Sequence, residues 1–216
     1  MPNWCDNNIT ITGPNKIIDK IDKIVAEEGS EGNLLQYFYP MPKELEDTKA
    51  PADNPNSLEN KSRKLKFGAD SWYDWRVDNW STKWDVNEFY GIRRIELGID
   101  ESEISFGFDS AWAPPIGAYE NFLNENSNVS IKASYYEGGC DFMGIWDNGD
   151  DICYEVSTIA PKGSTDKFWT SAEGKELDDL YGITESMAQY EAEQEAERIG
   201  DNKEIIDYSK GEKVNV

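Results

Sequence analysis

Histidine is absent from the 216 residues of this sequence. The absence excludes Ser-His and Cys-His nucleophilic pairs, imidazole general bases and metal sites with histidine ligands. The sequence therefore predicts no catalytic residue, no metal ligand and no cofactor. An enzyme that uses carboxylates with Mg²⁺, or a lysine-aspartate pair, is the least favoured alternative, because no D-x-D or E-x-x-D set stands out among the 43 acidic residues.

Cysteine is scarce and long apolar runs are missing. The three cysteines, Cys5, Cys140 and Cys153, have no paired spacing, and the chain does not open with a charged segment followed by an apolar one. No window approaches the roughly 18 consecutive apolar residues that a bilayer span requires. We therefore expect a cytoplasmic protein with reduced thiols and no contact with a membrane.

Basic residues are few: 21 lysines and arginines stand against 43 aspartates and glutamates, a formal net charge of -22. This charge repels phosphate backbones at long range, so we expect no direct binding of DNA or RNA. The expected partner is cationic or neutral. A dense carboxylate surface could imitate the charge of a nucleic acid, or it could serve only to keep the protein soluble.

Strand and helix patterns alternate along the first three quarters of the chain. Strand patterns occupy residues 7–14, 89–99, 104–108 and 129–135, and a hairpin turning at Asn148-Gly149 follows; helical patterns begin at Asn15 and Pro115. The order strand, helix, strand, strand, helix, strand is typical of a ferredoxin-like split βαβ fold. We therefore predict an α+β protein with an antiparallel sheet and two helices.

Two parts of the chain lie outside this pattern. Residues 34–67 mix prolines with a polar stretch that has no period, so we expect a ferredoxin-like domain over residues 1–156 with a long insertion at about 34–90. Residues 157–216 are expected to form an acidic, partly helical extension, with Thr184 as the N-cap of a helix. Residues 137–216 hold 20 acidic and 7 basic residues, a net charge of -13.

The segment WYDWRVDNWSTKWDV, residues 72–86, is the first candidate site, because tryptophans alternate there with charged residues. Buried aromatic rings mostly serve cores, so the rings could simply pack over the sheet with their N–H groups bonded. Alternatively, the cluster could stack a planar ligand or hold a side chain of a partner. The candidate binding residues of this segment are Asn79, Trp80, Lys83, Trp84 and Asp85.

The segment FDSAWAPP, residues 108–115, adds Asp109 and Trp112 at the junction between a strand and a helix. Backbone N–H groups at the helix start could meet an anion, but no glycine-rich phosphate loop accompanies them. A turn satisfied by Asp109 or Ser110 is therefore the favoured interpretation. The stretch DNGDD lacks the length and the glutamate of a calcium loop, and no basic neighbour in sequence activates Cys140.

Four separated stretches, MPNWCDNNITITGP, NWSTKWD, FDSAWAPP and YYEGGCDFMGIW, resemble the YubB-like family of phage and plasmid proteins and follow that family's order. The resemblance covers residues 1–156 and not the acidic extension. It implies a ferredoxin-like α+β domain carried by mobile genetic elements. It implies no established catalytic residues, and it directs attention to residues 79–85 and Trp112.

Two functions follow from these observations. The favoured one is a non-enzymatic accessory protein of a phage or plasmid that binds and modulates a host or defence protein with a basic surface in the host cytoplasm. The alternative is a protein that binds a small planar ligand. In that case Trp80 and Trp84 would stack a nucleotide-like ring while Lys83 or Arg76 meets a phosphate. The sequence leaves the oligomeric state open.

Overall fold

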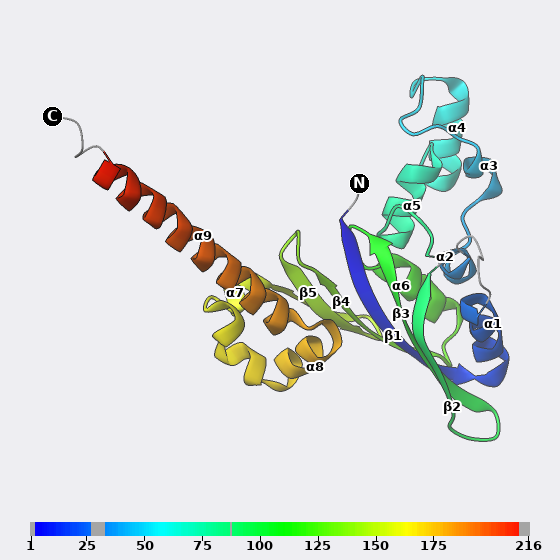
Figure 1. Cartoon of the computed structure of the whole chain (residues 1–216). Coiled ribbons are helices and arrows are strands. Elements are labelled where there is room, and N and C mark those ends of the chain that lie inside the picture. Colours follow the sequence, from blue (N-terminus) through cyan, green and yellow to red (C-terminus); the bar gives the residue numbers. More distant parts are fainter. Residues whose placement is uncertain (1–2, 27–32, 87, 212–216) are drawn as a thin grey trace. The chain divides into compact units, whose positions relative to one another are not determined.

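The computed structural model describes residues 3–26, 33–86 and 88–211, with side chains described as far as Ile199 (Figure 1). The chain divides into two compact units, Met1–Glu155 and Val156–Val216. The predicted α+β class and antiparallel sheet are confirmed.

A six-stranded sheet in the order β2-β3-β1-β4-β5-β6 forms the framework of the first unit. Its strands are β1 (Trp4–Pro14), β2 (Phe89–Glu96), β3 (Glu101–Ala111), β4 (Ser130–Glu137), β5 (Phe142–Asp147) and β6 (Asp150–Glu155). Every neighbouring pair is antiparallel. The central strand β1 pairs with β3 along its whole length, from Trp4 opposite Ala111 to Pro14 opposite Glu101. This pairing places the end of β3 beside the start of the chain.

The described residues of the first unit form six helices. They are α1 (Asn15–Ala26), α2 (Leu34–Phe38), α3 (Lys43–Glu46), α4 (Leu58–Phe67), α5 (Trp72–Trp80) and α6 (Ile116–Glu125). Both helices that the sequence predicted are present, as α1 and α6. The segment in which no period was recognised also contains helices. Caps rather than an apolar stripe define α4: the Ser57 side chain accepts from the Asn60 N–H, Gly68 ends the helix in a left-handed conformation, and Asn60 is its only buried residue.

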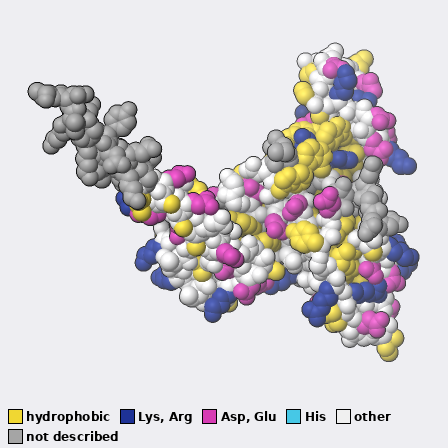
Figure 2. Space-filling model, in the orientation of Figure 1, with side chains coloured by type: hydrophobic (Ala, Val, Ile, Leu, Met, Phe, Trp, Pro, Cys, Tyr) yellow, Lys and Arg dark blue, Asp and Glu magenta, His cyan; other side chains and the backbone are white. Residues whose placement is uncertain are grey.

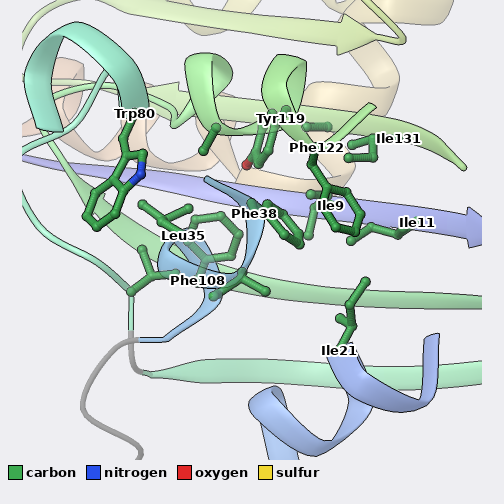
Figure 3. Packing of buried hydrophobic residues seen from close by; sticks show 14 of the residues in the cluster. Ile9, Ile11, Ile21, Leu35, Phe38, Trp80, Phe108, Tyr119, Phe122 and Ile131 are labelled. Atoms are coloured by element: carbon green, nitrogen blue, oxygen red, sulfur yellow. The ribbon is translucent and has the colours of Figure 1, made fainter. Parts of the chain in front are cut away.

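The core lies between one face of the sheet and helices α1, α2 and α6 (Figure 3). Ile9 and Ile11 of β1 are wholly buried, as alternation predicts for a half-buried strand. Phe38 of α2 stacks on Phe122 of α6, with ring centroids 4.4 Å apart and planes inclined by 24°. Each such side chain contributes roughly 1.5–3 kcal/mol when it leaves water, so this layer fixes α2 and α6 beside each other.

The second unit is helical. Its elements are α7 (Val156–Ile159), η1 (Gly163–Thr165), η2 (Lys167–Thr170), α8 (Ala172–Tyr181) and α9 (Ile183–Gly211). Trp169 is buried and donates from Nε1 to the Gly163 carbonyl at 3.0 Å. The prediction that Thr184 caps the last helix is wrong, because α9 already includes this residue and its N–H and hydroxyl both bond the Asp178 carboxylate. None of the helices that the structure describes is both long and apolar enough to traverse a bilayer.

Candidate functional site

The tryptophan-rich segment folds as helix α5 and the loop that follows it. The Ser71 hydroxyl accepts from the Asp74 N–H at 3.2 Å and so caps the start of the helix. Ser81 adopts a left-handed conformation with φ of 67° and ends the helix immediately after Trp80. The chain therefore changes direction between Trp80 and Lys83, and residues predicted as one site take different positions.

Trp80 belongs to the core. Its side chain is wholly buried, and its Nε1 donates to the Tyr39 carbonyl at 2.8 Å. The ring makes an edge contact with Trp75 at a centroid distance of 5.9 Å. With its donor satisfied and its faces covered, Trp80 offers nothing to a ligand.

Asn79 also serves the packing of the fold. Its Nδ2 donates to the Trp75 carbonyl at 2.8 Å. Its backbone carbonyl lies so close to Gly117 of α6 that a Cβ at position 117 would be 2.5 Å from the oxygen. Asn79 therefore marks the close approach of α5 to α6.

Asp85 anchors the start of α2. Its carboxylate accepts from the backbone N–H groups of Leu35, Gln36 and Val86, each at 2.8 Å. Burial raises the pKa of Asp85, while the three N–H donors and the nearby Arg76 charge favour its ionised form. Both oxygens are engaged by the backbone, so the structure gives Asp85 a role in joining the two segments.

Lys83 and Trp112, 29 positions apart in the sequence, meet at a cavity of about 500 Å³. The Lys83 ammonium lies 4.4 Å from the centroid of the Trp84 ring and 5.2 Å from that of Trp112. The Tyr73 ring is 5.8 Å away, and Trp84 itself packs against Trp4. The cation is thus held among aromatic rings by their quadrupoles.

This hollow, the Lys83 cavity, has an aromatic wall, an acidic margin and a proline-containing wall. It is lined by Ala50, Pro51, Ala52, Pro55, Asp70, Trp72, Tyr73, Asp74, Lys83 and Trp112. Figure 2 shows hydrophobic side chains gathered on the surface over α5, with basic side chains among them. Within the described part of the chain, Lys83 forms no ion pair. The cavity can therefore hold a planar group against its rings and present it with one positive charge.

Trp112 is held at the cavity by an unfavourable backbone conformation. Its φ is 70°, in the left-handed region that a bulky residue rarely adopts, and its N–H donates to the Asn3 carbonyl at 3.0 Å. The turn itself is satisfied by Ser110, whose hydroxyl donates to the Ala113 carbonyl at 2.8 Å. Trp112 keeps 39% of its surface exposed, so this turn places a ring at the mouth of the cavity.

Asp109 does not line the Lys83 cavity. It is exposed near the end of β3, directly opposite Asp6 on β1. Partial burial raises the pKa of Asp109, and the nearby charges of Asp6 and Glu88 raise it further. The Tyr90 hydroxyl donates to the Asp6 carboxylate. These groups form a separate acidic patch on the sheet.

Arg76, which the planar-ligand alternative named as a phosphate contact, lies beside two tryptophan rings of α5. Its guanidinium lies 5.3 Å from the centroid of Trp72 and 4.8 Å from that of Trp80. Its Nε is buried and finds no hydrogen-bond partner among the residues that the structure describes. Burial lowers the pKa of Arg76, while the charges of Asp85 and Glu46 raise it. The spacing of Trp72, Arg76 and Trp80 at four-residue intervals is the sequence signal for this stack.

The YEGGC stretch is explained by a buried carboxylate. Glu137 accepts from the backbone N–H groups of Gly139 and Cys140 and so closes the turn between β4 and β5. Its hydrogen bond raises the pKa of the exposed Cys140 thiol, which disfavours the nucleophilic thiolate. Among the residues that the structure describes, no group of three or more cysteine or carboxylate side chains is arranged to hold a metal ion.

Comparison with known proteins gives little further guidance. No family model matches the chain, and no curated protein matches it. The solved structure "Crystal structure of a protein api92 from Yersinia pseudotuberculosis, family-model DUF1281" is similar to it with a TM-score of 0.38 and 12% identity, over 72% of this chain and 98% of that chain. A likeness this distant carries no argument about the site.

Proposed function

We propose that this chain is a non-catalytic binding protein that holds a planar group of its ligand in the Lys83 cavity. The observation that carries the proposal is the meeting of Lys83 and Trp112 at a hollow of about 500 Å³. Cavities of this size with aromatic walls and few polar groups suit small ligands or single side chains. The lining residues contain no histidine, cysteine or serine that could act as a nucleophile with a base beside it.

The planar group can stack on the rings of Trp72 or Trp112, while Lys83 faces an electron-rich ring or an attached acceptor. A stacked aromatic pair contributes roughly 0.5–1.5 kcal/mol beyond its buried area, and a partly desolvated cation over a ring contributes roughly 0.5–2 kcal/mol. Trp80 does not take part, because its ring is sealed in the core. The planar-ligand alternative is therefore retained with Trp72 and Trp112 in place of Trp80.

Tryptophan fluorescence tests this proposal with two probes, N-acetylphenylalanine amide and adenosine monophosphate. Binding should change the emission of the cavity tryptophans, and Lys83→Met should weaken it about tenfold, since one cation–π contact of roughly 1–2 kcal/mol is lost. The matched control is Lys16→Met, which removes an exposed lysine from α1. Unchanged emission with both probes, or equal losses in both variants, would contradict the proposal.

We also propose, as a second candidate, that the acidic surface binds a basic surface of a host or defence protein in the cytoplasm of a cell that carries a phage or plasmid. The net charge of -22 supports a cationic partner, and the three free cysteines support a reducing compartment. The mobile-element origin rests on the resemblance to the YubB-like family. Affinity capture from a host lysate should lose the partner as salt rises; capture that salt does not weaken would contradict an electrostatic contact.

The same resemblance leads us to infer a ferredoxin-like split βαβ arrangement within the first unit. The order β2-β3-β1-β4, with α1 between β1 and β2 and α6 between β3 and β4, supports this inference. Strands β5 and β6 would then extend the sheet beyond β4. An experimental structure in which α1 and α6 lie on opposite faces of the sheet would contradict it.

A further inference from the structure

A second, polar hollow adjoins the Lys83 cavity. It has a volume of about 290 Å³ and shares Ala52 and Asp70 with its neighbour. Its other lining residues are Asp47, Thr48, Lys49, Asp53, Asn54, Ser57, Glu59, Asn60 and Arg63. The Lys83 cavity and this hollow, the Asp47 cavity, therefore form one groove with an aromatic part and a part rich in oxygen atoms.

The two basic residues of the Asp47 cavity are already paired. Lys49 bonds Asp53 at 2.8 Å, and Arg63 bonds Glu59. Asp47 and Asp70 have no ion-pair partner among the described residues. Asp70 is the charged member of the two residues that the cavities share, so uncompensated negative charge lies where they join.

The remaining polar wall of the Asp47 cavity is already held in place by its own hydrogen bonds. Asn60 is 9% exposed; its Nδ2 donates to the Asn54 carbonyl at 2.7 Å, and its Oδ1 accepts from Arg63 at 2.9 Å. Ser57 accepts from the Asn60 N–H as the cap of α4. The groups left to meet a ligand are therefore chiefly the carboxylates of Asp47 and Asp70.

We propose that this groove binds a peptide segment of a partner protein that carries an aromatic side chain and, close to it in sequence, an arginine or lysine. The aromatic ring enters the Lys83 cavity and stacks on Trp72 or Trp112. The basic group crosses to the Asp47 cavity and pairs with Asp70 and Asp47. This inference rests on the function proposed above and names the chemistry of the occupant.

Charge complementarity favours a peptide over a nucleotide. A phosphate held by Lys83 would lie in a cavity that Asp70 and Asp74 also line, and the net charge of -22 opposes its approach. The same carboxylates attract a guanidinium group, because a carboxylate can accept two parallel hydrogen bonds from its planar N–H groups. Arginine is therefore expected to bind more tightly than lysine.

A series of short peptides tests the inference with the full chain. The probes are acetyl-Phe-(Gly)n-Arg-amide with no, one, two or three glycines, and the same peptides with citrulline, which keeps the shape of arginine without its charge. Phenylalanine does not obscure tryptophan emission, so binding can be followed through the tryptophan fluorescence of the protein. At the best spacing the arginine peptide should bind about fivefold more tightly than its citrulline counterpart, as one charged hydrogen-bonded pair predicts.

Two variants locate the effect. Asp70→Asn should bring the arginine-to-citrulline affinity ratio close to one, whereas Glu120→Gln, which removes one exposed charge from α6, should leave the ratio unchanged. Asp47→Asn should also lower the arginine-to-citrulline affinity ratio, and it replaces Asp70→Asn in the test if that variant does not fold. Equal binding of the two peptides by the wild-type chain, or equal effects of the groove and control variants, would overturn the inference.

N-acetylphenylalanine amide separates the two proposals. If it binds and Lys83→Met weakens it, but arginine adds no affinity, the binding function stands and the peptide inference fails. If N-acetylphenylalanine amide, adenosine monophosphate and all the peptides fail to bind, both proposals fail.

Discussion

The tryptophan-rich segment has a core side and a cavity side, and the same residue type serves differently on each. Trp75 and Trp80 are buried in the core, and the Trp80 N–H bonds a backbone carbonyl. Trp72 packs only partly against the core and also lines the Lys83 cavity together with Lys83 and Trp112. Burial and a satisfied donor mark a structural ring, whereas an aromatic surface beside an unpaired cation marks a binding surface. The comparison shows that tryptophan density alone does not locate a site.

Trp80→Ala is expected to have the largest effect on the core side. Removal of a wholly buried indole should lower the free energy of unfolding by about 3–5 kcal/mol, because a cavity forms and a hydrogen bond is lost. Urea denaturation measures this change, with Trp84→Ala as the control on the cavity side. If Trp84→Ala were the more destabilising variant, the assignment of the two sides would be reversed.

Asp85→Asn should come next, with a loss of about 2 kcal/mol in the free energy of unfolding. The amide can accept at one atom only, so at least one of the N–H groups of Leu35, Gln36 and Val86 loses its acceptor. Asp78→Asn, on the exposed surface of α5, is the matched control and should leave the urea midpoint unchanged. Equal midpoints for the two variants would show that Asp85 does not anchor α2.

On the cavity side, variants of Trp112 test the left-handed backbone conformation of this residue. Because its φ is 70°, Trp112→Gly should be more stable than Trp112→Ala by about 1 kcal/mol, although glycine is the more flexible residue in the unfolded chain. Both variants lose the ring and should bind N-acetylphenylalanine amide equally weakly. A more stable alanine variant would mean that the left-handed turn is absent in solution.

Asp109→Asn should have the smallest effect, and this effect depends on pH. The pKa of Asp109 is raised above its ordinary value of 3.8, so its contribution to stability is fully present below that value and is lost as pH rises through the raised pKa. At neutral pH the variant should be more stable than the wild type by about 0.5 kcal/mol or less after solvent screening. The gain should vanish once the pH lies well below 3.8, and a gain that persists there would rule out relief of carboxylate repulsion.

The strands and the two main helices were predictable because their signals are local. Alternation about Ile9 and Ile11 identified β1, and isoleucines at helical spacing identified α1. Helix α4 was missed because a polar helix with one buried residue leaves no periodic trace; its start depends on the cap at Ser57. Thr184 was predicted as a cap from its residue type and position, but its hydroxyl bonds Asp178 of the preceding helix, a contact that the sequence does not show.

The predicted binding residues do not all lie together in the structure, and binding by those that do stays a prediction. Lys83, Trp84 and Trp112 lie together, as their placement in one candidate site required. Trp80 and Asp85 form hydrogen bonds with α2 and the residue that follows it, and no pattern in the sequence predicts these partners. The proline wall of the cavity comes from the stretch without a period, so its part in the site could not be inferred from spacing.

The sequence by itself determined the class of the fold, the strong negative charge and the exclusion of histidine chemistry, because these depend on composition and on short-range periodicity. Only the tertiary structure decided which tryptophans face the core and which face the Lys83 cavity. That choice depends on a left-handed residue at Ser81, which ends α5, and on the pairing of β1 with β3, which brings Trp112 beside Lys83. The first is a local backbone conformation and the second joins distant parts of the chain, and the spacing of the tryptophans predicts neither.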